Sequence, residues 1–89
     1  MSEKWKIKLN IYSILSQEDE TDETAVKIAN ELADYLEIEL KKANIDSCKE
    51  IIEELRISQH EYEVNDALQN LYDWADEERI WLGIFEDNE

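Results

Sequence analysis

The chain has 89 residues and a formal net charge of −15, from 24 acidic and nine basic side chains. It contains one glycine, one cysteine, one histidine and no proline. These counts exclude a glycine-rich phosphate-binding loop, an internal disulfide and a thiolate zinc site. Hydrophobic residues make up 43% of the sequence, which predicts one globular domain over residues 1–89.

The charge is unevenly distributed. Residues 1–15 hold three lysines and one acid, a net charge of +2, whereas residues 16–89 hold 23 acids and six bases, a net charge of −17. Acids are concentrated in residues 18–23 and in residues 59–79. Self-repulsion of this kind lowers stability. The acidity therefore indicates either recognition of a basic partner or a purely solubilising role.

Two strands are predicted, one near each end of the chain. In residues 4–12 the apolar side chains Trp5, Ile7, Leu9 and Ile11 alternate with polar ones, which is typical of a strand with one buried face. Residues 80–85 form a short apolar run that also predicts a strand. We expect the two strands to pair.

Three helices are predicted between the strands, over about 24–43, 48–57 and 58–78, from apolar residues spaced three and four apart. Thr21 or Asp22 is expected to cap the first helix, and Asn44 to end it in a left-handed conformation. The expected starts of the other two helices are the capping boxes Ser47/Glu50 and Ser58/Glu61. The pattern predicts an α+β fold, a small β-α-α-α-β domain with three helices packed on a two-stranded sheet. An all-α bundle of three to four helices is the alternative.

The sequence offers little for catalysis or metal binding. His60 lies at a helix start beside carboxylates and is expected to be solvated surface, and Cys48 is expected to be a small buried thiol. Asp19, Glu20 and Asp22 could attract a hard cation, but their spacing does not match a calcium-binding loop. We therefore expect no enzymatic activity, no catalytic residue, no metal and no cofactor.

The acidic residues are the main functional signal. Carboxylates three and four positions apart on a helix lie about 5–6 Å apart, a spacing similar to that of phosphates along a DNA strand. The third predicted helix offers such a row, with Asn70 filling one position. The residues expected to bind a partner are Glu63, Asp66, Asp73, Asp76 and Glu77, together with Glu18, Asp19, Glu20 and Asp22. Trp81 or Phe85 is expected to be an apolar interface anchor, because the last strand is apolar on both faces.

Two segments, residues 5–12 (WKIKLNIY) and 71–81 (LYDWADEERIW), resemble small acidic accessory proteins of tailed bacteriophages. The resemblance implies a compact protein that acts on host machinery. Such proteins include anti-restriction and anti-CRISPR inhibitors, among which acidic DNA mimics recur. No functional residue is transferred by this resemblance.

The sequence as a whole predicts a non-enzymatic acidic protein that inhibits a host nucleic-acid-processing or defence protein by mimicking DNA. An immunity protein or antitoxin against a basic nuclease or toxin is one alternative, and a virion assembly or structural component is another. The expected partner is a basic or nucleic-acid-binding host protein, with no direct contact to nucleic acid or membrane. A homodimer through the sheet is also expected. The absence of a signal sequence or membrane segment predicts a cytoplasmic location, in the host cell if the protein is phage-encoded.

Overall fold

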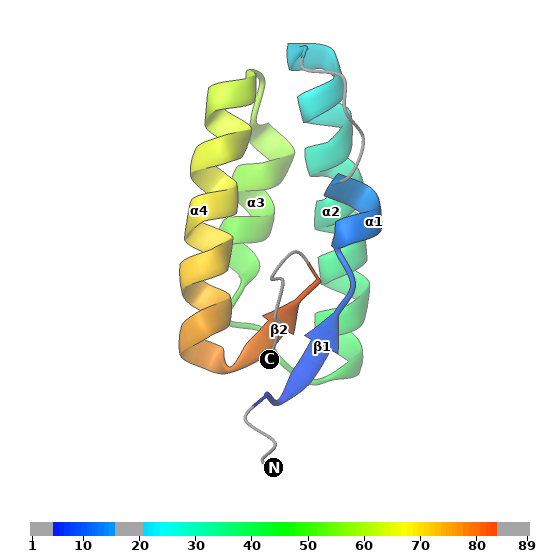
Figure 1. The fold of residues 1–89 in the computed structure, drawn as a ribbon, viewed down its shortest axis with the longest axis vertical. Helices are drawn as coiled ribbons and strands as arrows, with labels where there is room; N and C mark the ends of the chain where they lie inside the picture. The colour runs from blue at the N-terminus through cyan, green and yellow to red at the C-terminus, as the bar shows by residue number, and fades with distance from the viewer. Residues whose placement is uncertain (1–4, 16–20, 84–89) are drawn as a thin grey trace.

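The computed structural model describes residues 5–15 and 21–83 (Figure 1). In chain order the elements are β1 (Ile7–Leu9), α1 (Tyr12–Leu15), α2 (Asp22–Lys42), α3 (Lys49–Ile57), α4 (Glu61–Glu78) and β2 (Ile80–Leu82). The helices α2, α3 and α4 run alternately down, up and down, and the two strands lie together at one side of them (Figure 1). The predicted α+β domain, with helices packed on a two-stranded sheet, is confirmed.

The sheet is parallel and pairs the two ends of the described chain. Ile7 is opposite Ile80, and Leu9 is opposite Leu82. Parallel pairing follows from the topology, because the chain reverses direction four times, on entering α2, α3, α4 and β2, and so returns to the direction of β1. The inward side chains of this sheet are apolar, whereas Lys8 and Trp81, which are paired in the middle of the sheet, point away from the core.

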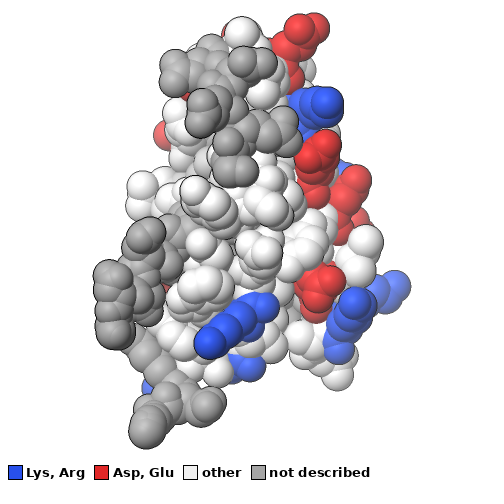
Figure 2. All heavy atoms as spheres, turned by 45° about the vertical axis from the view of Figure 1, so that its right-hand side comes forward, with Lys and Arg blue, Asp and Glu red and all other residues white. Residues whose placement is uncertain are grey.

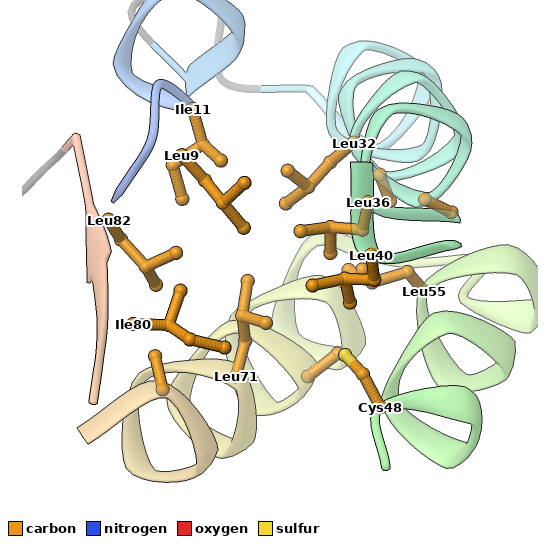
Figure 3. Packing of buried hydrophobic residues seen from close by; sticks show 14 of the residues in the cluster. Leu9, Ile11, Leu32, Leu36, Leu40, Cys48, Leu55, Leu71, Ile80 and Leu82 are labelled. Atoms are coloured by element: carbon orange, nitrogen blue, oxygen red, sulfur yellow. The ribbon is translucent and has the colours of Figure 1, made fainter. Parts of the chain in front are cut away.

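The core is formed by one apolar stripe from each long helix and the inner face of the sheet (Figure 3). Ile80 and Leu82 enter from β2 on one side, and Leu55 and Cys48 enter from the α3 side opposite (Figure 3). Leu36 and Leu71 are completely buried between them. Each fully buried aliphatic side chain contributes about 1.5–3 kcal/mol of hydrophobic stabilisation. This core is what holds a two-stranded sheet that would be marginal alone.

The N-terminal strand is shorter than predicted. Instead of one strand over residues 4–12, the structure has the three-residue β1 followed by the single-turn helix α1. The backbone N–H groups of Ile14 and Leu15 both donate to the Ile11 carbonyl, over 3.1 and 3.0 Å. These three apolar residues are spaced three and four apart, so they share a helix face. In the last predicted strand, residues 80–82 are extended, and residues 84 and 85 lie outside the described part.

Both predicted caps of α2 form, although the helix begins at Asp22, two residues earlier than predicted. Thr21 is the N-cap, and its hydroxyl accepts the Thr24 N–H at 3.1 Å. Asn44 follows the last turn with a φ of 64°. The N–H of Ile45 then donates to the Leu40 carbonyl at 2.9 Å, which gives the hydrogen-bond pattern of a Schellman motif.

Neither predicted capping box forms. The N-cap residues of α3 and α4 are Cys48 and His60, and neither makes a side-chain capping bond. The Ser47 hydroxyl instead accepts the indole N–H of Trp74 at 2.8 Å. The Ser58 hydroxyl donates to the Glu54 carbonyl at 2.7 Å. Ser47 therefore links the start of α3 to α4, whereas Ser58 closes the last turn of α3. No described helix is long and apolar enough to cross a membrane.

Candidate interaction surface

The predicted acidic residues of the third helix lie on α4. Asp66, Asp73 and Glu77 are exposed, and Glu63 is half-buried. Their spacing of three or four residues, counting Asn70, places them along one side of the helix. We call Glu63, Asp66, Asp73 and Glu77 the acidic row. Asp76 is also exposed, but it lies about 100° around the helix from Glu77, because successive residues rotate by that angle.

The acidic row carries negative charge that no nearby base neutralises. The ion pairs of residues 5–15 and 21–83 join Lys6 to Glu78, Lys42 to Glu39, Arg56 to Asp34 and Glu37, and His60 to Asp22. None of them includes a member of the row. Over its whole length, α4 includes several acidic side chains and no basic one. This side of α4 therefore carries a net negative charge, interrupted only at Asn70.

Helix α3 adds a carboxylate beside the row. The side-chain amide of Asn70, which interrupts the row, donates to Glu54 Oε1 at 3.0 Å. Glu54 was not among the predicted site residues, because the apolar spacing of α3 indicates only a helix that packs on the core. The sequence does indicate exposed negative charge on this helix, because Glu53 and Glu54 lie away from its apolar stripe.

The N-terminal part of the row borders a groove between α3 and α4. This α3–α4 groove has a volume of about 210 Å³ and is lined by Glu54, Ile57, Ser58, Glu63, Asp66 and Ala67. Glu63 is fixed at its edge, because Glu63 Oε1 accepts the Gln59 N–H at 2.7 Å. The structure thus brings together two of the predicted residues, Glu63 and Asp66, with Glu54 from another helix.

Asp22 does not lie on a free acidic surface. Its Oδ1 accepts the Glu61 N–H at 2.9 Å, and its Oδ2 lies 3.1 Å from His60 Nδ1. The carboxylate therefore caps the start of α4 from the first turn of α2. The hydrogen bond from Glu61 and then the contact with His60 hold the pKa of Asp22 below its ordinary value of 3.8.

Of the remaining predicted residues, only Trp81 lies in the described part, and it belongs to β2 rather than to the acidic row. Trp81 is half-buried on the outer face of the sheet, where Lys8 Nζ lies 5.8 Å from the centre of an indole ring, within range of a cation–π contact. Glu18, Asp19, Glu20 and Phe85 lie outside the described residues. Partner binding by Glu18, Asp19, Glu20 and Phe85 therefore stays a prediction.

The two side chains with the most reactive chemistry have ordinary surroundings. Cys48 is 1% exposed, and burial raises the pKa of its thiol to about 12, so the nucleophilic thiolate is scarce at neutral pH. His60 is exposed and stacks on Tyr62, with ring centres 5.4 Å apart. Among the described residues, no three His, Cys, Asp or Glu side chains are grouped so that they could hold a metal ion.

A larger groove lies between α2 and α3. Its volume is about 640 Å³, and its apolar lining includes Leu40, Cys48 and Ile52. Three acidic and three basic side chains line it: Glu37, Asp46 and Glu53, with Lys41, Lys49 and Arg56. This balance gives the groove no preference for either sign of charge.

No family model, curated protein or solved structure matches this chain. The case for function therefore depends on the surface chemistry.

Proposed function

We propose that this chain is a non-enzymatic acidic binding protein that occupies the basic surface of a nucleic-acid-processing or defence protein and so blocks access of nucleic acid to it. The observation that carries the proposal is the acidic row on α4, whose carboxylates are exposed or half-buried and have no basic partner among the described residues. The resemblance to phage accessory proteins supports a phage-type inhibitor.

The arrangement of charge supports competition with DNA. A helix that carries carboxylates three and four residues apart presents negative charges at intervals of about 5–6 Å, close to the interval between phosphates. A cationic groove that binds a DNA strand could therefore bind the acidic row in the same way, because the carboxylates are spaced like the phosphates. Rigid attachment to α4, whose inner side chains Leu71 and Ala75 are completely buried, would keep that line straight without an ordering cost on binding.

Long-range attraction would bring the partners together. A net charge of −15 and a basic target increase the rate of encounter at low ionic strength. Because the Debye length falls from about 10 Å at 0.1 M to about 3 Å at 1 M salt, this attraction is strongly screened at high salt. Steep salt dependence is thus the signature of the proposed mechanism.

The test is capture and competition. The immobilised protein is incubated with bacterial lysate at low and at high salt, and each captured protein is tested for DNA binding in the presence and absence of the free chain. We expect capture of a DNA-binding protein at low salt and release of its DNA by the chain. The charge-reversal variant Asp66→Lys/Asp73→Lys should lose both effects.

A matched control separates the row from net charge. The variant Glu23→Lys/Glu31→Lys makes the same charge change at exposed positions of α2 and should retain capture and competition. Equal loss in both variants would show that only the overall charge matters. Capture that is insensitive to salt, or a captured protein that binds no nucleic acid, would overturn the proposal.

A further inference from the structure

We propose that the α3–α4 groove is a receptor for one arginine side chain of the basic partner, with Ile57 as the apolar contact beside it. This inference rests on the proposed function and defines where its partner is held. The proposal depends on the shape of the groove, its apolar lining and the sign of its charge together.

The lining of the groove combines apolar and acidic parts. Ile57, at the last position of α3, is 64% exposed, and Ala67 of α4 is 1% exposed and forms part of the interior. Around them stand the carboxylates of Glu54, Glu63 and Asp66, and no basic side chain lines the groove. A long cationic side chain fits this combination, because its aliphatic stem can cover apolar surface while its charged end meets the carboxylates.

The size of the groove favours a single side chain. Its volume of about 210 Å³ is below the roughly 300–1,000 Å³ of sites that enclose small organic ligands. The larger α2–α3 groove, with about 640 Å³, has the space for such a ligand but an equal number of acids and bases. Of these two grooves, the smaller one is lined by acids and no base, which favours a positively charged occupant.

Two of the three carboxylates are positioned before any partner arrives. Glu54 is held by the Asn70 amide at 3.0 Å, and Glu63 is held by the Gln59 N–H at 2.7 Å. Each bond uses one carboxylate oxygen, Oε1, and leaves the other for a partner. Asp66 has no hydrogen-bond or ion-pair partner among the described residues. Groups fixed in this way lose little conformational entropy when they bind.

Arginine suits this arrangement better than lysine. Its planar guanidinium presents five N–H donors in a fixed geometry and can bridge carboxylates from two directions, here from α3 and from α4. It is also more weakly hydrated than an ammonium group, so contact with Ile57 and Ala67 costs it less. The exposed Ile57 then gives the partner an apolar contact within an acidic surround, the combination found at interface anchors.

The experiment uses the whole chain and a defined probe. The ¹⁵N-labelled protein is titrated with a short glycine-flanked peptide that has one central arginine, and with its lysine and citrulline counterparts. We expect saturable shifts of the backbone amides of residues 54–59 and 63–67 with the arginine peptide. The lysine peptide should bind at least about threefold more weakly, and the uncharged citrulline peptide should cause no saturable shift.

Variants with equal charge locate the site. Glu54→Gln/Asp66→Asn should weaken binding of the arginine peptide about five- to tenfold, since exposed charge pairs contribute modestly one by one. Glu54→Gln retains an oxygen that can accept the Asn70 amide. Glu23→Gln/Glu31→Gln removes the same charge from α2 and should change the affinity less than about twofold. Ile57→Ser, which alters no charge, should weaken binding about threefold.

The peptide titration tests the arginine site independently of the proposed function. Shifts spread over all acidic residues, equal loss in both double variants, or equal affinity for arginine and lysine would overturn it. Saturable arginine binding at the groove without capture of a DNA-binding protein would support the receptor and contradict the proposed function. The reverse result would leave the proposed function standing and remove the groove as its arginine site.

Discussion

Arg79 ends α4 in a left-handed conformation, with φ 62° and ψ 47°. Its carbonyl accepts the Lys6 N–H at 2.6 Å, so this turn also sets the start of the parallel pairing. A side chain with a Cβ is strained there, whereas glycine adopts this region freely. We expect Arg79→Gly to raise the free energy of unfolding by about 0.5–1 kcal/mol, measured by urea denaturation.

The control for this prediction is the other residue with positive φ. Asn44, at φ 64°, belongs to a residue type that tolerates this region through its short polar side chain. Asn44→Gly should therefore raise the free energy of unfolding by less than Arg79→Gly does. If Arg79→Gly is instead less stable than the wild type, the arginine side chain contributes more than its backbone strain costs.

Gly83 marks a close approach between the end of β2 and the segment after β1. A Cβ at this position would lie 3.0 Å from Asn10 Oδ1, 3.2 Å from Asn10 Cα and 3.2 Å from the Ile11 nitrogen. Two of these three atoms are backbone and cannot rotate away. We expect Gly83→Ala to destabilise the fold by about 1–3 kcal/mol, measured by thermal denaturation. Adding Asn10→Ala should recover only part of the loss, and full recovery would show that the side chain alone causes the clash.

At the scale of elements, Asp22 links the starts of two helices that are distant in sequence. Its carboxylate belongs to α2 and accepts the Glu61 N–H of α4. Asp22→Ala removes this acceptor and should lower the melting temperature at pH 7. The variant Asp22→Asn retains a side-chain oxygen but not the charge. Its melting temperature should therefore lie between those of Asp22→Ala and the wild type. Equal melting temperatures for the alanine variant and the wild type would show that the linkage carries no stability.

The pH dependence of this linkage has a definite sign. The pKa of Asp22 is lowered in the folded protein, first by the Glu61 hydrogen bond and then by His60. The stabilisation is therefore complete above the ordinary value of 3.8 and is lost as the pH falls below it through the folded pKa. The difference in melting temperature between wild type and Asp22→Ala should shrink as the pH is lowered below 3.8. A constant difference down to pH 2 would contradict this assignment.

The long helices could be predicted from sequence because their apolar stripes are buried as the spacing requires. The contacts between elements could not, since they depend on which helix starts meet in space. Ser58 and Glu61 match a capping box by spacing, yet Ser58 donates to its own preceding turn and Asp22 supplies the cap. The helix α1 was not predicted, because a single turn of four residues is too short for helical spacing to stand out beside the alternating run that precedes it.

At the scale of the whole molecule, the sequence predicted where negative charge lies on α4 but not the groove beside it. The row follows from spacing within one helix. The groove requires α3 to cross next to α4, so that Glu54 and Ile57 meet Glu63 and Asp66. Periodicity within a helix gives no information on that crossing. The acidic row was therefore visible in sequence, whereas its arginine-sized groove depends on tertiary packing.

The sheet side differs in charge from the α4 side. Lys6 and Lys8 are exposed there, and Tyr12 of α1 is 60% exposed. With the side that carries α1 and α2 turned forward, Figure 2 shows a broad central area in which the described residues include no acid, with lysine or arginine at its lower end and acids along its right edge. Judged from the described residues, a second copy would meet less repulsion at this face than along the acidic row of α4.

We expect two copies to associate through this face, with Trp81 at the contact. The indole is half-buried on the outer side of a sheet whose helices cover only the inner face, and completing its burial contributes at most about 1.5–3 kcal/mol per copy. Sedimentation equilibrium should give twice the chain mass of 10.6 kDa at high concentration and moderate salt. Trp81→Glu should reduce this to the monomer mass. Ile57→Glu, which places the same charge at an exposed apolar residue on α3, should leave the dimer intact. A wild type that stays at 10.6 kDa would contradict the dimer, because repulsion between two chains of charge −15 would then exceed what Trp81 supplies.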